Sequence, residues 1–375
     1  MPSRTLSLES YRRGARLLIY WLLFAFFAVG AFIAPLNLAP LYAAPVGQTS
    51  QAPSQFRLAF IVGAIATICM IGLRYEVGPD WNTYHVIFLS ARTDYLSAAL
   101  KLGDPGYEAL NWIAYELGAE IWLVNLFAAA IFGWGLFRFC SAQPAPWVAA
   151  AIAVPYLIIV VAMGYTRQSV ALGVLMAGLA RQGRGASVLN FAIYVAIAAT
   201  FHKTAVVVFP LVALAGRGSK FIGFLIAVCA SILLYDSFLQ SAVGSLIKNY
   251  IDTDYSSQGA FVRIAMNMLA AVLLWAFKGK LGFSPHEFKI WRNFGLAALL
   301  FVILFAVIPS STAVDRMSLY IIPLQLAVLT RVALLGRHRT SGIAGVLLYM
   351  FAVQYVWMNF ASHAQYWVPY QLYPL

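Results

Sequence analysis

The chain has 375 residues, of which 62% are hydrophobic and 10% are charged, and its mean hydropathy is +0.80. Soluble domains carry about 25% charged residues, so no soluble fold could bury this much apolar surface. The formal net charge is +12. Most Lys and Arg lie in short loops between apolar segments, where they act as topology signals rather than as a nucleic-acid-binding surface. The composition therefore predicts a polytopic membrane protein that does not bind nucleic acid.

The apolar segments begin close to the amino terminus and continue to the end of the chain. Residues 17–36 follow Arg12, Arg13 and Arg16 and resemble a signal peptide, but the apolar run is longer than a typical signal sequence, so we predict a membrane anchor. Backbone polar groups must be satisfied internally in lipid, which leaves helices as the expected structure. We predict an all-α integral membrane protein, a single transmembrane domain over residues 1–375, with about twelve transmembrane helices. The expected segments are 17–36, 57–73, 119–138, 146–163, 166–181, 186–201, 204–216, 221–239, 261–278, 293–309, 317–335 and 341–358.

Basic residues recur in every second loop and predict the orientation. Cytoplasmic loops of membrane proteins are enriched in Lys and Arg. Counting back from the later loops places the amino terminus outside, where its arginines disagree with this rule, so the topology before residue 57 is left open. The basic residues that mark the cytoplasmic side are Arg138, Arg181, Arg184, Arg217, Lys220, Lys278, Lys280, Arg331, Arg337 and Arg339.

Two outward loops, 75–118 and 240–260, are too long to be simple turns. In the first, Tyr84, Phe88, Tyr95 and Leu96 stand at helical spacing, which predicts a helix along the membrane interface. Gly103 and the residues after it should break that helix. Loops of this length in a compact protein are usually functional or disordered, and these loops are too aromatic for disorder. We expect both loops to lie in the periplasm and to carry amphipathic helices.

Four polar clusters stand at the ends of apolar segments, and the orientation puts them on the outer face. They are residues 74–80, 164–168, 201–203 and 315–316. Charged groups near hydrocarbon are costly and persist mainly where they face a polar cavity, a partner or a substrate. A cationic cleft with a few acids indicates an anionic, membrane-bound substrate such as a lipid pyrophosphate. The cysteines Cys69, Cys140 and Cys229 are far apart, so we expect no metal site, no disulfide framework and no cofactor.

The clusters resemble the motifs of one family. The run Arg74-Tyr75-Glu76-Val77-Gly78-Pro79-Asp80 with Tyr84 is similar to the R-Y-x-V-G-x-D-x-x-x-Y signature of the EpsG family of polysaccharide polymerases, which are related to Wzy O-antigen polymerases. The resemblance spans roughly residues 57–335. Its other blocks are Asp104-Pro105-Gly106-Tyr107, Gly164-Tyr165-Thr166-Arg167-Gln168, Phe201-His202-Lys203-Thr204-Ala205, and Asp315-Arg316 with Tyr320.

The resemblance implies chemistry at the outer face of the bacterial inner membrane. Such a polymerase moves a growing glycan from undecaprenyl pyrophosphate onto a sugar hydroxyl of the next lipid-linked repeat unit. Its partners would be these lipid-linked glycans, the bilayer, a chain-length regulator and a flippase. The reaction calls for cations at the pyrophosphate, a base for the acceptor hydroxyl and a groove for lipid and glycan.

The residues offer candidates for each role. An Arg meets phosphate oxygens with two parallel hydrogen bonds, and Lys acts as a point charge. Interface anchoring or pairing with nearby carboxylates would explain the same cations. For the base, Asp80 and His202 compete, with a slight preference for Asp80; each could instead serve local structure. The pyrophosphate candidates are Arg74, Arg167, Lys203, Arg263 and Arg316, and the glycan candidates are Glu76, Tyr84, Gln168 and Tyr320.

Three other functions share these features. An O-antigen ligase would use a similar site, and a metal-dependent lipid-linked sugar transferase would use Glu76 and Asp80 as metal ligands. A flippase for lipid-linked oligosaccharides would also place Arg in a polar path, but nearer to the middle of the bilayer on broken helices.

Overall fold

The computed structural model describes residues 3–36, 54–216, 259–308, 311–336 and 338–374. Over these ranges the chain is all-α, and its only pairing of extended backbone is an isolated bridge between Arg74 and Leu372. The helices are α1 Ser3–Ile33, α2 Ser54–Gly72, α3 Trp81–Ser90, α4 Leu96–Ala99, α5 Pro105–Glu116, α6 Ile121–Ser141, α7 Pro146–Ala153, α8 Thr166–Gln182, α9 Val188–Phe201, α10 Phe209–Ala213, α13 Ala260–Ala276, α14 Pro285–Val307, α15 Ser311–Ser318, α16 Ile322–Val332 and α17 Arg339–Phe360. Shorter 3₁₀ or π-helical segments are η1 Val154–Ala162, η2 Lys203–Val208, η5 Leu319–Ile321 and η6 Ser362–Tyr366.

Within the described ranges, five stretches are long and apolar enough to cross a membrane: Ser54–Gly72, Ile121–Ser141, Pro285–Val307, Thr312–Val332 and Arg339–Phe360. They confirm the all-helical, multi-pass class. Five other apolar helices have 10 to 17 residues, so the count of about twelve spans stays a prediction. The predicted segment 221–239 and the predicted loop 240–260, apart from its last two residues, lie outside the described residues.

Two predicted boundaries are wrong for identifiable reasons. The segment expected at 293–309 begins at Pro285, because Ser284 and Glu287 form a reciprocal capping box. The segment expected at 317–335 begins in α15 and passes through the 3₁₀ turn η5 into α16, where Pro323 is the second residue. Arg316 therefore lies inside this span rather than at its start.

Helices α6 and α8 form the centre of the bundle and touch along their backbones. A Cβ atom on Gly135 would lie 1.8 Å from the carbonyl oxygen of Gly173, and one on Gly173 would lie 2.6 Å from the Cα of Phe132. Small residues let membrane helices approach this closely. This packing fixes α8, which carries Arg167 at its amino-terminal end.

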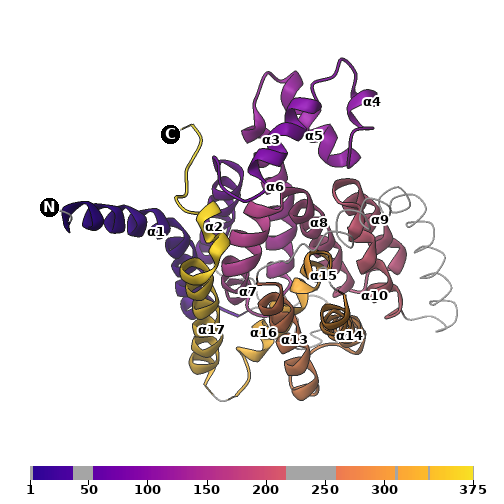
Figure 1. The fold of residues 1–375 in the computed structure, drawn as a ribbon. Helices are drawn as coiled ribbons and strands as arrows, with labels where there is room; N and C mark the ends of the chain where they lie inside the picture. The colour runs from indigo at the N-terminus through magenta and orange to yellow at the C-terminus, as the bar shows by residue number, and fades with distance from the viewer. Residues whose placement is uncertain (1–2, 37–53, 217–258, 309–310, 337, 375) are drawn as a thin grey trace.

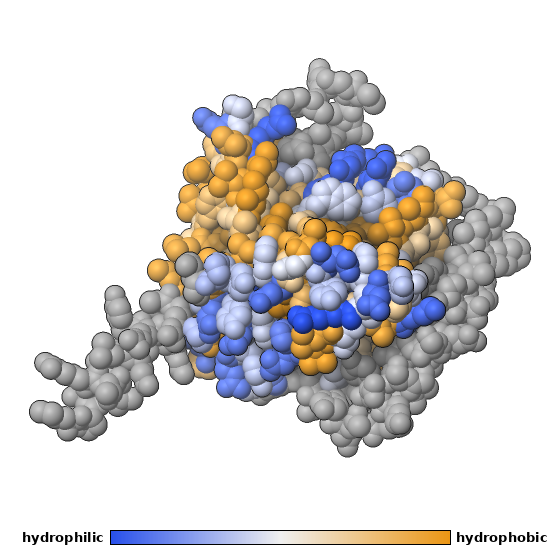
Figure 2. Space-filling view, turned by 90° about the horizontal axis from the view of Figure 1, so that it is seen from above, coloured by the Kyte–Doolittle hydropathy of each residue, from blue (hydrophilic) through white to orange (hydrophobic). Residues whose placement is uncertain are grey.

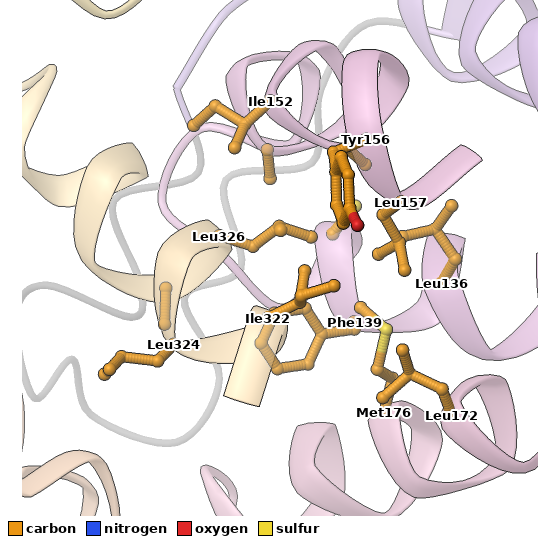
Figure 3. Packing of buried hydrophobic residues seen from close by; sticks show 14 of the residues in the cluster. Leu136, Phe139, Ile152, Tyr156, Leu157, Leu172, Met176, Ile322, Leu324 and Leu326 are labelled. Carbon is orange, nitrogen blue, oxygen red and sulfur yellow. The ribbon is translucent and has the colours of Figure 1, made fainter. Parts of the chain in front are cut away.

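The core is built from helices far apart in the sequence. All residues of α7 and η1 after Pro146 are buried, as expected of a helix that is hydrophobic on every side. The burial of the long spans varies: 28% of the most apolar stretch of α2 is buried, against 78% for Thr312–Val332, so α2 lies at the periphery. Figure 3 shows side chains of α6, α7, η1, α8 and α16 meeting in this core: Leu136, Phe139, Ile152, Tyr156, Leu157, Leu172, Met176, Ile322, Leu324 and Leu326.

The first long loop forms a cap over one end of the bundle (Figure 1). The single interfacial helix expected there is replaced by α3, α4 and α5, with α5 beginning directly after Asp104. Hydrophilic residues gather on this end when the molecule is seen from above (Figure 2). The cap thus brings polar side chains over the ends of the long helices.

Candidate functional site

A cavity of about 110 Å³ lies at the capped end of the bundle. All four polar clusters singled out in the sequence contribute to its wall. The lining residues are Asp80, Tyr84, Arg167, Gln168, His202, Thr204, Ala313, Arg316 and Met317. The structure therefore brings together residues far apart in the chain, such as Asp80 and Arg316, which are 236 positions apart.

Asp80 is positioned by a tight turn after α2. Gly78 has φ +106, and a Cβ there would lie 2.4 Å from the carbonyl oxygen of Met163, so only glycine fits. The carboxy-terminal tail fastens the same turn: the Gly78 amide donates to the Tyr366 carbonyl at 2.8 Å, and the Tyr75 amide donates to the Gln371 carbonyl at 2.9 Å. The turn and the tail together hold Asp80 at the start of α3.

Arg316 contacts three groups around the cavity. Its Nη2 lies 3.3 Å from Asp80 Oδ2, and its guanidinium lies 3.7 Å from the centre of the Tyr165 ring. Gln168 Nε2 donates to the Arg316 carbonyl at 2.5 Å. The side chains of Arg316 and Asp80 are each 30% exposed, so an entering anion can reach this guanidinium. The stacking on Tyr165 fixes the plane of the guanidinium.

Arg167 is the second residue of α8. Its Nη1 donates to Asp104 Oδ2 at 2.9 Å, and its backbone amide donates to the Tyr84 hydroxyl at 3.4 Å. Its Nε is buried and has no hydrogen-bond partner among the described residues. A buried donor without a partner is costly, so this atom is suited to an acceptor supplied by a ligand.

His202 caps the end of α9 and faces both the cavity and Asp104. Its Nδ1 lies 3.8 Å from Asp104 Oδ2, and its side chain is 26% exposed. Burial lowers the pKa of His202 below its usual value, and Arg167 and Arg316 lower it as well. The Asp104 carboxylate acts in the other direction and raises this pKa. The imidazole is therefore neutral near pH 7 and able to accept a proton.

Three further candidates from the sequence complete the wall or the layer behind it. Tyr84 lines the cavity, and Tyr320, which is buried, contacts the lining residue Thr204, with the two hydroxyl oxygens 3.1 Å apart. Gln168 lines the cavity as well, and its Oε1 has no partner among the described residues.

Four other candidates do not line the cavity. Arg74 is 1% exposed, and its guanidinium donates to the Ile71 and Val77 carbonyls, Asn125 Oδ1 and Thr166 Oγ1, so it holds α2, α6 and α8 together. Arg263 is also buried and forms a two-pronged ion pair with Asp315, the neighbour of Arg316. Glu76 is exposed, and its backbone has a φ of 51°. Lys203 is half-buried at the start of η2.

The structure adds two acids that the sequence reading did not select. Asp104 is 5% exposed and contacts both Arg167 and His202 from behind the cavity wall. Glu108 lies one turn later in α5, is 3% exposed, and burial raises its pKa to about 7. The block Asp104-Pro105-Gly106-Tyr107 was a visible signal, but an Asp before a Pro also fits an ordinary helix start. Among the described residues, no group of three His, Cys, Asp or Glu side chains could hold a metal ion.

The fold and the cavity define a class: a helical, multi-pass membrane protein with an arginine- and histidine-lined cavity at one end of its bundle. The model of the EpsG family matches residues 57–372, which is most of the chain. The chain belongs to the EpsG family, which is associated with exopolysaccharide biosynthesis. The resemblance seen in the motifs is confirmed, and the match extends into the carboxy-terminal tail. Searches of curated proteins and of solved structures found no significant match.

Proposed function

We propose that this protein is a polysaccharide polymerase that acts at the outer face of the bacterial inner membrane. It transfers a growing glycan from undecaprenyl pyrophosphate to a hydroxyl of the next lipid-linked repeat unit. The observation that carries the proposal is the meeting of Arg167, Arg316 and His202, from three different helical regions, in one cavity. Membership of the EpsG family supports the same substrate class.

The two arginines suit the pyrophosphate. Each contacts a carboxylate, Asp104 for Arg167 and Asp80 for Arg316, and a guanidinium carries five N–H donors in a fixed plane. The side chains of both arginines are about a third exposed, at 32% and 30%. A guanidinium binds phosphate oxygens through two parallel hydrogen bonds, so two of them can hold the leaving group while its charge increases.

His202 is the better base in this geometry, in contrast to the slight preference for Asp80 drawn from the sequence. The Asp80 carboxylate pairs with Arg316 at 3.3 Å, so a cation already engages the group that would have to take the proton. His202 lies beside the Asp104 carboxylate, which favours protonation of the ring against the effect of Arg167 and Arg316, and its lowered pKa leaves it neutral near pH 7. In the proposed step the acceptor oxygen bonds to the anomeric carbon, its proton moves to the imidazole, and the bond from carbon to the pyrophosphate oxygen breaks. Undecaprenyl pyrophosphate leaves with that electron pair.

The test replaces Arg167 and Arg316 one at a time in cells and compares each variant with replacement of an arginine outside the cavity. Arg167→Ala and Arg316→Ala should abolish polymer and cause single lipid-linked repeat units to accumulate, while the protein stays inserted in the membrane. Arg167→Lys should restore little, because a point charge does not reproduce the guanidinium geometry. Arg181→Ala is the control: it changes the same residue type at the far end of α8, where the side chain is exposed.

The outcomes separate the proposal from its rivals. Polymer of normal length in both Ala variants would contradict the proposed pyrophosphate site. If polymer forms normally but is not joined to its final acceptor, the protein is a ligase. If lipid-linked units accumulate only on the cytoplasmic side, the protein is a flippase.

A further inference from the structure

Asp104 is a buried carboxylate that touches two groups of the proposed site at once. Its Oδ2 lies 2.9 Å from Arg167 Nη1 and 3.8 Å from His202 Nδ1. It does not line the cavity, whereas both of its partners do. It therefore lies behind the proposed base, on the side of the ring that carries Nδ1.

We infer that Asp104 is a positioning residue: its carboxylate accepts a hydrogen bond from His202 Nδ1–H and leaves Nε2 free to take the proton of the acceptor hydroxyl. This inference rests on the proposed function. At 3.8 Å the two atoms are farther apart than in a normal hydrogen bond, and we expect this distance to shorten when substrate binds, as catalytic hydrogen bonds often do.

The arrangement has a defined effect on the proton. A carboxylate at Nδ1 fixes the tautomer of the ring and stabilises the imidazolium that forms when Nε2 is protonated. Arg167 donates to the same Asp104 oxygen at 2.9 Å, so in this proposal the carboxylate acts as an acceptor and not as a proton carrier. The proton thus moves from the hydroxyl to His202 and goes no further during the transfer.

The charges around His202 set its titration. Asp104, at the start of α5, favours the imidazolium, and Arg167 of α8 and Arg316 of α15 oppose it. Asp80 lines the same cavity as His202, and Glu108, one turn into α5, interacts with Asp104 and Arg167 and has a pKa that burial raises to about 7. Lys203, the next residue in the chain, is half-buried. Asp104 should therefore have a larger effect on His202 than any of these.

The test measures the protonation of the His202 ring directly and does not depend on the activity of the protein. The full-length protein, labelled with ¹⁵N-histidine and placed in lipid bilayers, is titrated by solid-state NMR, and His202→Gln identifies its signal among the five histidines. The wild type should carry the neutral proton on Nδ1. Asp104→Asn should shift the titration midpoint of His202 to lower pH, because the carboxylate that favours the charged ring is gone. Asn also starts helices well, so α5 should stay folded.

Glu108→Gln is the matched control and should move the midpoint less than Asp104→Asn does. A wild-type ring protonated on Nε2 overturns the inference, and so does an Asp104→Asn midpoint equal to that of the wild type. An equal shift in Glu108→Gln also overturns it, because the effect would then be that of any nearby acid.

A second readout uses unpolymerised lipid-linked units extracted from a strain that lacks this chain. His202→Gln should lower the rate of glycan lengthening by about 10² to 10⁴, the usual contribution of a positioned base. In Asp104→Asn the rate should fall and the rising limb of the pH profile should move to lower pH. If the rate falls but the rising limb of the pH profile stays in place, Asp104 only holds Arg167. That result would overturn the inference and leave the proposed function intact. No lengthening by the wild type contradicts the proposed function, and the NMR result still decides the role of Asp104.

Discussion

Two ion pairs that involve the neighbouring residues Asp315 and Arg316 should differ strongly in how much stability is lost when their acid is removed. Asp315 pairs with Arg263 inside the protein, where the side chains are 3% and 9% exposed. Asp80 pairs with Arg316 at the cavity, where both side chains are 30% exposed. Removing one member of a buried pair leaves an uncompensated charge and costs about 3–5 kcal/mol, whereas an exposed pair contributes about 0–1 kcal/mol.

Asp315→Asn should therefore destabilise the protein strongly, and Asp80→Asn should not. At about 2 °C per kcal/mol, the midpoint of thermal unfolding should fall by roughly 6–10 °C in Asp315→Asn and by at most about 2 °C in Asp80→Asn. The assay is thermal unfolding of the purified protein in detergent, followed by the fluorescence of its 10 tryptophans.

A double variant isolates the buried charge as the cause. Arg263→Met with Asp315→Leu removes both charges and should recover much of the loss, since apolar replacement of a buried pair is often neutral or better. Equal midpoints for Asp315→Asn and Asp80→Asn would refute the reasoning, and so would a double variant no more stable than Asp315→Asn alone.

Three further predictions concern packing, pH and topology. Gly135→Ala should destabilise the protein by about 1–3 kcal/mol, because its Cβ would overlap the Gly173 carbonyl. The control, Gly345→Ala in α17, places its Cβ in open space and should be neutral. Equal effects of the two variants in unfolding assays would contradict the close packing of α6 on α8. Burial raises the pKa of Glu108 to about 7, so this group stabilises the fold fully below its unfolded pKa and the stabilisation is lost as the pH rises through 7. Glu108→Gln should therefore flatten the fall of the thermal unfolding midpoint between about pH 4.5 and 7. An unchanged dependence of the midpoint on pH would refute a buried acid. In a cysteine-free background, an impermeant maleimide added outside should label Tyr75→Cys and Asp94→Cys and spare Lys280→Cys, and the reverse pattern would overturn the orientation.

The class of fold and the charged or titratable residues that line the cavity could be predicted from the sequence. Apolar runs of membrane length fix where helices form, because the backbone has no other way to satisfy its polar groups in lipid. The polar clusters at the helix ends could be assigned to one face, since the orientation rule depends only on loop charges. Asp80, Arg167, His202 and Arg316 therefore could be selected before the structure was known.

The pairing of charges could not be read in the same way. Arg263 pairs with Asp315, 52 positions away, and Arg167 pairs with Asp104, 63 positions away. Such contacts depend on how helices pack, and no sequence period encodes them. Arg74 looked like a ligand-binding cation, but its donors are used by neighbouring helices, as the cost of a buried guanidinium requires.

The central claim is that the cavity transfers glycan from a lipid pyrophosphate to a sugar hydroxyl. The most direct measurement reconstitutes the purified protein in liposomes with unpolymerised lipid-linked units extracted from a strain lacking this chain, and follows glycan length and free undecaprenyl pyrophosphate together. We predict longer glycans with release of one undecaprenyl pyrophosphate for each bond formed, and loss of both in Arg167→Ala. Lengthening that persists in Arg167→Ala, or units that cross the bilayer without lengthening, would contradict it.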